Sequence, residues 1–297
     1  MQNKCCLNLL PVLLLFWGCE KKSTNSMTEP SEYSAFGNPQ RVTIQNYNDH
    51  AMEPFLTRDG RYLFFNNLND PAVNTNLHYA ERIDDVTFTY KGEIGGVNTP
   101  ALEGVPTMDR HGNFYFVSPR SYDSTFSTIY KGSFSEGQIS NVTLVQGISK
   151  QEAGMVNFDV EVSSEGNTLY TVDARFGMTG GPQTADLVMA ERDGANFRRA
   201  SNSADLMRNV NTSALEYAAG ISSDGLELFL TRVESLASTP AVYRAARKDL
   251  QEPFGAPQKI SSIQGFVEGA TLSPDEKSLY YHKQEGGWFA IYRVTRQ

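Results

Sequence analysis

The sequence predicts an all-β domain, and more specifically a five-bladed β-propeller of four-stranded antiparallel blades. Three observations predict this fold. A polar turn followed by an apolar triplet recurs five times, and a second short apolar segment follows each copy. No stretch has the hydrophobic periodicity of a convincing helix. The 14 Tyr and 17 Phe also favour strands, because aromatic rings pack well on a pleated surface.

The recurring turn is the first element of each repeat. Its copies read TRDGRYLFF (57–65), MDRHGNFYF (108–116), SSEGNTLYT (163–171), SSDGLELFL (222–230) and SPDEKSLYY (273–281). Asp-Gly turns a chain because Gly accepts positive φ and Asp bonds its own backbone. The triplets that follow are apolar at consecutive positions, so their strands must be covered on both faces. Each copy is therefore a hairpin between stacked sheets.

The remaining strands follow from the columns on either side of the hairpin. One apolar strand comes after each turn, at 77–80, 129–132, 187–190, 242–245 and 291–294. Upstream, VNTPALE (97–103) and VNTSALE (210–216) are near copies, as are FGNPQRVTI (36–44) and FGAPQKI (254–260). The chain thus begins with an outer strand and ends after a third strand. We expect 36–44 to pair with 289–295, which closes the ring and removes open sheet edges.

The repeat resembles a known one. GATLSPDEKSLYY and its relatives are similar to the TolB-type propeller repeat, in which an Asp-Gly turn precedes a Leu-Tyr-Phe-like strand. The resemblance covers about residues 36 to 297 and implies the propeller fold. It says little about function, because one fold hosts many unrelated roles.

The N-terminal segment is different in composition. An apolar run at 7–16 is too short to span a bilayer and fits a signal peptide. Gly18-Cys19 and the polar residues after it resemble the lipobox of bacterial lipoproteins, which implies lipidation of Cys19; an ordinary secretory signal is the alternative. We therefore expect a signal peptide (1–18), a flexible tether (19–35) and the propeller (36–297). The expected location is the bacterial cell envelope, anchored by lipid in the outer membrane, with the domain periplasmic or surface-exposed.

Composition excludes several functions. The net charge of −8 argues against nucleic-acid binding. All three cysteines (5, 6 and 19) precede the domain, which therefore has no disulfide and no thiol chemistry. The four histidines (50, 78, 111 and 282) fall in separate repeats without metal-ligand spacing, so we expect solvent-facing or ordinary strand histidines, no metal and no cofactor.

Candidate binding residues cluster at one rim, where long loops between the second and third strands of each blade are expected. A column of carboxylates stands near the start of each innermost strand: Glu53, Glu103, Asp159, Glu216 and Glu268. These groups could bind a cation or a polyhydroxylated ligand, but we favour an architectural role as hydrogen-bond acceptors. Rim residues that could grip an anion or stack on sugars are Arg120, Arg175, Arg232 and Trp288.

From these features we expect a membrane-tethered, monomeric, non-enzymatic scaffold that binds an envelope protein or a glycan. The alternative is a carbohydrate-active enzyme, either a glycoside hydrolase or a polysaccharide lyase, that uses carboxylates at the channel mouth. No blade carries a distinct acid constellation in the sequence, so we assign no catalytic residue and expect no turnover.

Overall fold

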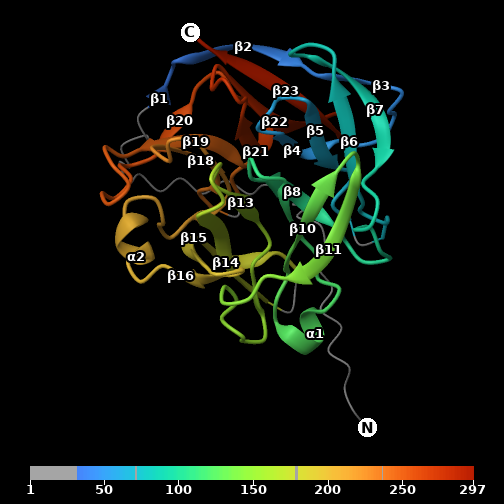
Figure 1. Cartoon of the computed structure of the whole chain (residues 1–297). Coiled ribbons are helices and arrows are strands. Elements are labelled where there is room, and N and C mark those ends of the chain that lie inside the picture. The colour runs from blue at the N-terminus through green and yellow to red at the C-terminus, as the bar shows by residue number, and fades with distance from the viewer. Residues whose placement is uncertain (1–31, 71, 178–179, 236) are drawn as a thin grey trace.

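The computed structural model describes residues 32–70, 72–177, 180–235 and 237–297. These residues are mostly strand, and the helices among them are two of four residues each, α1 (Tyr122–Thr125) and α2 (Ser203–Leu206). Both lie in connections outside the sheets (Figure 1). In the described part of the chain no helix has the length and apolar character needed to cross a bilayer. The all-β prediction is confirmed.

Three sheets each contain at least three strands that follow one another in sequence, and two N-terminal strands add to two of them. The first contains β4 (Met52–Leu56), β5 (Tyr62–Asn66), β6 (Leu77–Arg82) and β7 (Thr87–Glu93), with β3 (Thr43–Gln45) on its outer edge. The second contains β8 (Gly104–Met108), β9 (Asn113–Val117), β10 (Ile129–Ser135) and β11 (Gln138–Leu144). The third contains β21 (Phe266–Leu272), β22 (Ser278–Glu285), β23 (Trp288–Arg296) and β2 (Phe36–Arg41).

The fourth sheet has ten strands and consists of two parts. One part holds β12 (Met155–Val156), β13 (Val160–Val162), β14 (Thr168–Phe176), β15 (Pro182–Asp193) and β16 (Asn196–Arg199). The other holds β17 (Leu215–Ile221), β18 (Glu227–Val233), β19 (Ala241–Ala246), β20 (Gln258–Ile260) and β1 (Glu32–Tyr33). A single parallel pair, Ala185 with Leu215, joins the two parts.

The predicted hairpin turns are present in all five copies. Gly60, Gly112, Gly166 and Gly225 adopt φ values of 72°, 81°, 72° and 74°, and Glu276 adopts 58° without being glycine. Glu276 has a compensating contact, because its Oε1 accepts hydrogen bonds from the N–H and hydroxyl of Ser223, 2.7 and 2.6 Å away. One expected long loop, 172–185, is instead largely an extension of β14 and β15.

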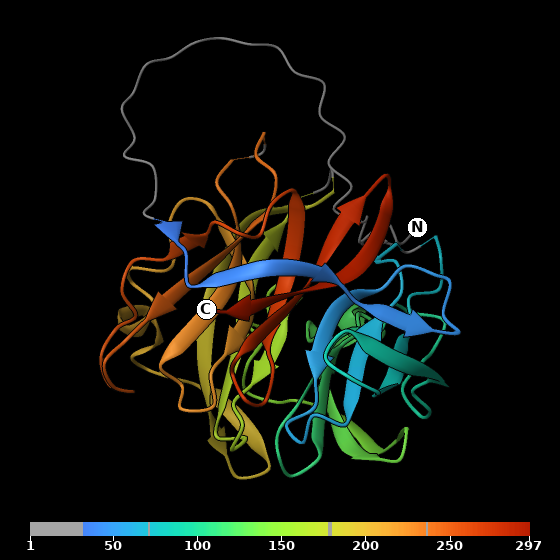
Figure 2. The ribbon, with the colours of Figure 1, turned by 90° about the horizontal axis from the view of Figure 1, so that it is seen from above.

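The three N-terminal strands belong to three different sheets. The expected pairing with the end of the chain is present, since β2 is antiparallel to β23 and Phe36 lies opposite Arg296. However, 36–44 is not one outer strand: β3 leaves the third sheet and pairs in parallel with β7. Residues 32–33, predicted to be tether, form β1 and pair with β20. Figure 2 shows this blue segment running across the red and orange sheets.

The sheets pack face to face around the strands that begin each hairpin. β4 contacts β8, β8 contacts β13, β13 contacts β17, β17 contacts β21, and β21 contacts β4. Every residue of β5 is buried, as expected for a strand covered on both faces. Phe64 on β5 packs edge-on against Phe114 of the next sheet, with ring centroids 5.3 Å apart. This packing brings the five inner strands together near the centre (Figure 1).

Candidate functional site

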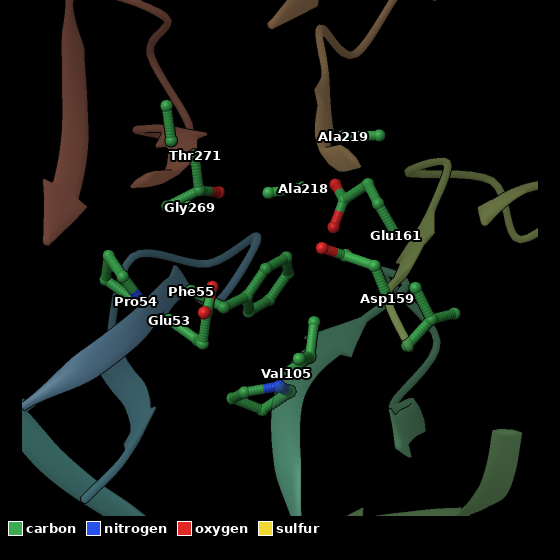
Figure 3. A pocket seen from close by; sticks show the side chains of 13 residues that line it. Glu53, Pro54, Phe55, Val105, Asp159, Glu161, Ala218, Ala219, Gly269 and Thr271 are labelled. Carbon is green, nitrogen blue, oxygen red and sulfur yellow. The ribbon is translucent and has the colours of Figure 1, made fainter. Parts of the chain in front are cut away.

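The inner strands share an irregularity that points residues toward the centre. Four of them shift register against their hairpin partner, and in each the first of the two residues inside the shift has positive φ. Those residues are Glu53 (48°), Val105 (54°), Ala218 (52°) and Gly269 (64°). All four, together with Asp159, line one small cavity of about 30 Å³ (Figure 3).

A larger cavity of about 110 Å³ adjoins the first. Glu53, Val105 and Asp159 line both cavities. The other lining residues of the larger cavity are Met52, Leu68, Asn69, Phe158, Tyr217, Glu268 and Phe289. Its wall is therefore largely apolar and aromatic, with carboxyl groups from three sheets, an arrangement typical of small-molecule sites.

The predicted carboxylate column divides into two groups. Glu53, Asp159 and Glu268 line the cavities. Glu103 and Glu216 are fully buried elsewhere and have structural partners. Glu103 accepts hydrogen bonds from the N–H and hydroxyl of Thr99, and Glu216 accepts the equivalent pair from Thr212 at 3.1 and 2.6 Å. The near copies VNTPALE and VNTSALE are thus one structural loop used twice, in which the carboxylate accepts hydrogen bonds from its own loop.

The predicted basic residues also lie outside the cavities. Arg232 is buried and pairs with Glu216, 2.9 Å away. Arg120 covers the ring of Tyr130 at 4.0 Å and donates to the carbonyl of Val97. Arg175 pairs with Glu152 at the surface. These contacts stabilise sheets and loops, and the cavity-lining residues do not include any of the three arginines.

Trp288, the predicted aromatic contact, keeps 43% of its surface exposed. It starts β23, immediately before the cavity-lining Phe289, and its indole stacks on His50 with ring centroids 4.1 Å apart. The prediction that histidines are ordinary surface or strand residues is therefore incomplete, because His50 supports an exposed aromatic ring.

His282 is the residue that sequence reasoning most clearly missed. It is fully buried and lies between two cavity carboxylates. Its Nδ1 accepts a hydrogen bond from the main-chain N–H of Glu53 at 3.1 Å, so the ring proton of the neutral imidazole is on Nε2. Nε2 lies 3.2 Å from Oε2 of Glu268, whose other oxygen accepts a hydrogen bond from the Tyr217 hydroxyl. Glu268 is therefore held as an acceptor by two donors.

Gly269 allows this arrangement to be compact. A Cβ at this position would lie 2.5 Å from Oε2 of Glu53 and 3.1 Å from Nδ1 of His282. Its φ of 64° also disfavours other residues. The glycine thus lets β21 approach the Glu53 side chain closely.

One residue of the small cavity, Glu161, takes part in an ion pair. Glu161 of β13 lines the cavity, pairs with Arg58 at 2.8 Å and accepts a hydrogen bond from the Thr107 hydroxyl at 2.6 Å. Arg58 stands in the first hairpin turn, so this ion pair ties that turn to β13. Figure 3 shows Glu53, Asp159 and Glu161 arranged around one space.

The pKa values of Glu53 and Asp159 differ from those of acids at the protein surface. Burial raises the pKa of Glu53, and the neighbouring Glu268 carboxylate raises it further while His282 opposes the shift. Burial raises the pKa of Asp159 well above its usual value, and the charge of Glu53 adds to this effect. Burial likewise raises the pKa of the Tyr217 hydroxyl. A proton is therefore retained among these groups more readily than at the surface.

Distance from the turn is the sequence signal that could have separated the two groups of carboxylates. Glu53 and Asp159 stand seven residues before their turn glycines, Glu103 and Glu216 stand nine before theirs, and Glu268 stands eight before Glu276. The residue seven positions before the turn faces the small cavity in every inner strand, because Val105, Ala218 and Gly269 occupy this position in the other three strands and also line the cavity. In the described residues, no group of three or more His, Cys, Asp or Glu could hold a metal ion.

Several solved structures share this fold. A thermostable family-43 glycoside hydrolase aligns with a TM-score of 0.55 at 11% identity, over 86% of this chain and 97% of that one. The catalytic domain of the Coprinopsis cinerea GH62 α-L-arabinofuranosidase aligns with a TM-score of 0.56 at 11% identity, over 90% and 98%. Zg3597, a family 117 glycoside hydrolase from Zobellia galactanivorans, aligns with a TM-score of 0.56 at 12% identity, over 90% and 91%. No family model matches the sequence, and neither does any curated protein.

These likenesses correct two predictions. The assignment to TolB-type lipoproteins is wrong, because the structural likeness is to propeller folds of glycoside hydrolases. The prediction of a non-enzymatic scaffold, which depended on that assignment, is wrong with it. The predicted lipidation at Cys19, the signal peptide and most of the tether lie outside the described residues.

Proposed function

We propose that this protein hydrolyses glycosidic bonds in the larger cavity, with Asp159 and Glu53 as the reacting carboxyl groups. The observation that carries the proposal is that two carboxyl groups from different sheets, the buried Asp159 and the mostly buried Glu53, line the same cavity. Glycoside hydrolysis needs such a pair, one protonated and one ionised. The fold shared with glycoside hydrolases supports the same reaction class, although the identity is low.

Asp159 is the better candidate for the proton donor. Burial and the charge of Glu53 both raise its pKa, so it keeps its proton when a more exposed Asp has lost it. In the reaction, this proton passes to the glycosidic oxygen as the bond from that oxygen to the anomeric carbon breaks. The leaving sugar thereby departs as a neutral alcohol.

Glu53 is the candidate for the second role, as the carboxylate that acts at the anomeric carbon. Its main chain is fixed by the hydrogen bond to His282, and Asn69 Nδ2 lies 3.5 Å from its Oε1. Either Glu53 takes a proton from the attacking water, or it attacks the carbon and water later releases the sugar. The configuration of the first product, followed by NMR, distinguishes these two routes.

Glu268 is the supporting carboxylate. Tyr217 and His282 both donate hydrogen bonds to it and fix the orientation of its side chain. Its charge opposes ionisation of Glu53 and its partners hold the aromatic side of the cavity in place. We therefore assign it a positioning role.

A second part of the proposal concerns the number of blades and the closure of the ring. We infer five blades, whose innermost strands are β4, β8, β13, β17 and β21, with β2 completing the last blade beside β23. Support comes from the cyclic contacts of these strands and from their joint contribution to one cavity. An experimental structure in which β21 and β4 lie apart would contradict the closed ring.

We also propose that the domain works outside the cytoplasm on a glycan. The cysteine-free domain and the apolar run at 7–16 support export. Cell fractionation, with N-terminal sequencing of the mature protein, tests this location.

The enzymatic proposal is tested by a substrate screen. The full-length protein is incubated with 4-nitrophenyl glycosides and with trisaccharides of arabinose, xylose and galactose, and release of nitrophenol or reducing sugar is followed. Asp159→Asn and Glu53→Gln remove the reacting groups, while Glu152→Gln alters a surface carboxylate as a matched control. The proposal predicts turnover by the wild type and the control only.

A further inference from the structure

The larger cavity has room for only a small part of a glycan. Its volume of about 110 Å³ is well below the ~300 Å³ at which pockets for drug-sized ligands begin. The space beside the carboxyl groups can therefore enclose at most one sugar unit. If the substrate is longer, its next sugar must lie at the rim.

The rim beside the cavity presents one exposed aromatic side chain. Among the described residues, the large hydrophobic side chains that are well exposed are Val73, Ile83, Leu250 and Trp288, of which only Trp288 is aromatic. Trp288 is followed by Phe289, whose ring lines the cavity and contacts the ring of His282 at 5.6 Å. The ring of His50 contacts both side chains, because it stacks on Trp288 and its centroid lies 6.0 Å from that of Phe289, and this places Trp288 next to the cavity wall.

The indole is held in a fixed orientation by the segment that leads into β4. His50 stacks on it with the ring planes inclined by 26°. Nδ1 of His50 accepts the main-chain N–H of Phe289 at 3.1 Å, and the next residue, Ala51, donates its N–H to the carbonyl of Phe289 at 3.1 Å. The hydroxyl of Tyr47 donates to the carbonyl of His50 at 2.8 Å. The stacked pair is therefore preorganised, which lowers the entropic cost of binding.

We propose that Trp288, stacked on His50, is a second sugar-binding subsite that holds the sugar ring adjoining the scissile bond. The proposal rests on the proposed glycosidase function. The C–H face of a sugar ring is apolar and packs on an aromatic ring, whereas its hydroxyl groups stay in water. The substrate class is then an oligosaccharide or polysaccharide that loses one terminal sugar at a time, and it is cleaved more efficiently than a glycoside whose leaving group is too small to reach Trp288.

The kinetic test compares two leaving groups. A trisaccharide that the wild type cleaves places a sugar on Trp288, whereas the glycosyl fluoride of its terminal sugar has a leaving group too small to reach it. In Trp288→Ala we expect kcat/KM for the trisaccharide to fall at least about tenfold, the effect of losing one good aromatic contact, with the fluoride unchanged. Leu250→Ala, which truncates another exposed side chain, is the control for both substrates.

Binding of a sugar to the subsite can also be measured without turnover, by tryptophan fluorescence. The chain has two tryptophans, Trp17 and Trp288, so full-length protein carrying Trp17→Phe and Asp159→Asn reports on Trp288 alone. We expect the trisaccharides of arabinose, xylose or galactose to shift or quench its fluorescence, and His50→Ala to weaken that response.

These experiments distinguish a failure of the glycosidase function from a failure of the subsite alone. A wild type that cleaves neither trisaccharide nor fluoride overturns the glycosidase function. A wild type that cleaves both, with equal losses or no loss in Trp288→Ala, overturns the subsite alone. A fluorescence signal that no trisaccharide changes also counts against the subsite.

Discussion

The main-chain N–H of Glu53 donates a hydrogen bond to Nδ1 of His282, 3.1 Å away, across 229 residues of sequence. The contact joins the first inner strand to the last sheet at the point where Glu53 enters the cavity. Because Glu53 has a φ of 48°, an uncommon value for a residue other than glycine, its backbone needs such external support. His282 thus positions Glu53 without touching the substrate.

Replacing His282 by Phe should therefore lower kcat more than it changes KM. The Glu53 N–H loses its acceptor and Glu268 loses a donor, so we expect kcat to fall by about 10²-fold, as for a displaced catalytic group. His282→Asn keeps an acceptor near the Nδ1 position and should recover part of the loss. Steady-state kinetics across pH provide the measurement, and a uniform loss of folded protein without a change in kcat would point to a structural role only.

Removing the buried acid should stabilise the protein. The folded-state pKa of Asp159 lies above its unfolded value, so the folded state binds more protons, and stability declines as pH rises from the unfolded pKa through the folded one. Asp159→Asn removes this penalty. At pH 7 we expect a higher Tm, by about 2–4 °C for each kcal/mol gained.

The gain should shrink as pH falls to about 4, close to the ordinary pKa of Asp, because the unfolded state then ionises only partly and is favoured less over the protonated folded state. Differential scanning calorimetry at the two pH values measures the difference. A Tm advantage that is the same at both pH values would show that ionisation of Asp159 is not its cause.

The fixed pair of Glu216 and Arg232 should matter for stability and not for chemistry. Both side chains are buried and 2.9 Å apart, so Glu216→Ala leaves the buried Arg232 with only the more distant carboxylate of Glu234, 3.6 Å away, and should cost about 3 kcal/mol. The Tm should fall by roughly 10 °C. In a double-mutant cycle, the loss in Glu216→Ala with Arg232→Ala should be smaller than the sum of the single losses. Additive losses would mean that the two residues act independently.

The N-terminal strand should contribute to global stability. Phe36 on β2 is buried, packs edge-on against Phe229 with centroids 5.9 Å apart, and lies under the guanidinium of Arg296. Phe36→Ala should cost about 3–5 kcal/mol in urea unfolding. Val73→Ala, at an exposed position, serves as the control and should stay within about 0.5 kcal/mol of the wild type. An effect of Phe36→Ala as small as that of the control would mean that β2 detaches without consequence.

The sequence predicted the strands well because their signals are local. An Asp-Gly turn and an apolar triplet each act over a few residues, and the five turns have the positive φ that this reasoning requires. The site was predicted less well because it depends on register. A two-residue difference in distance from the turn separates Glu53 from Glu103, and this difference decides whether a carboxylate faces the cavity or Thr99. His282 was missed because its partners come from two other strands.

The central claim is that Asp159 and Glu53 cleave glycosidic bonds together, and hydrolysis by matched variants tests it most directly. Wild type, Asp159→Asn, Glu53→Gln and Glu152→Gln are compared on the panel of glycosides and trisaccharides, with folding checked by Tm. We predict turnover in the wild type and in Glu152→Gln, and a loss of about 10²–10⁴-fold in each of the other two. Undiminished turnover in Asp159→Asn, or a folded wild type that cleaves no substrate of the panel, would contradict the claim.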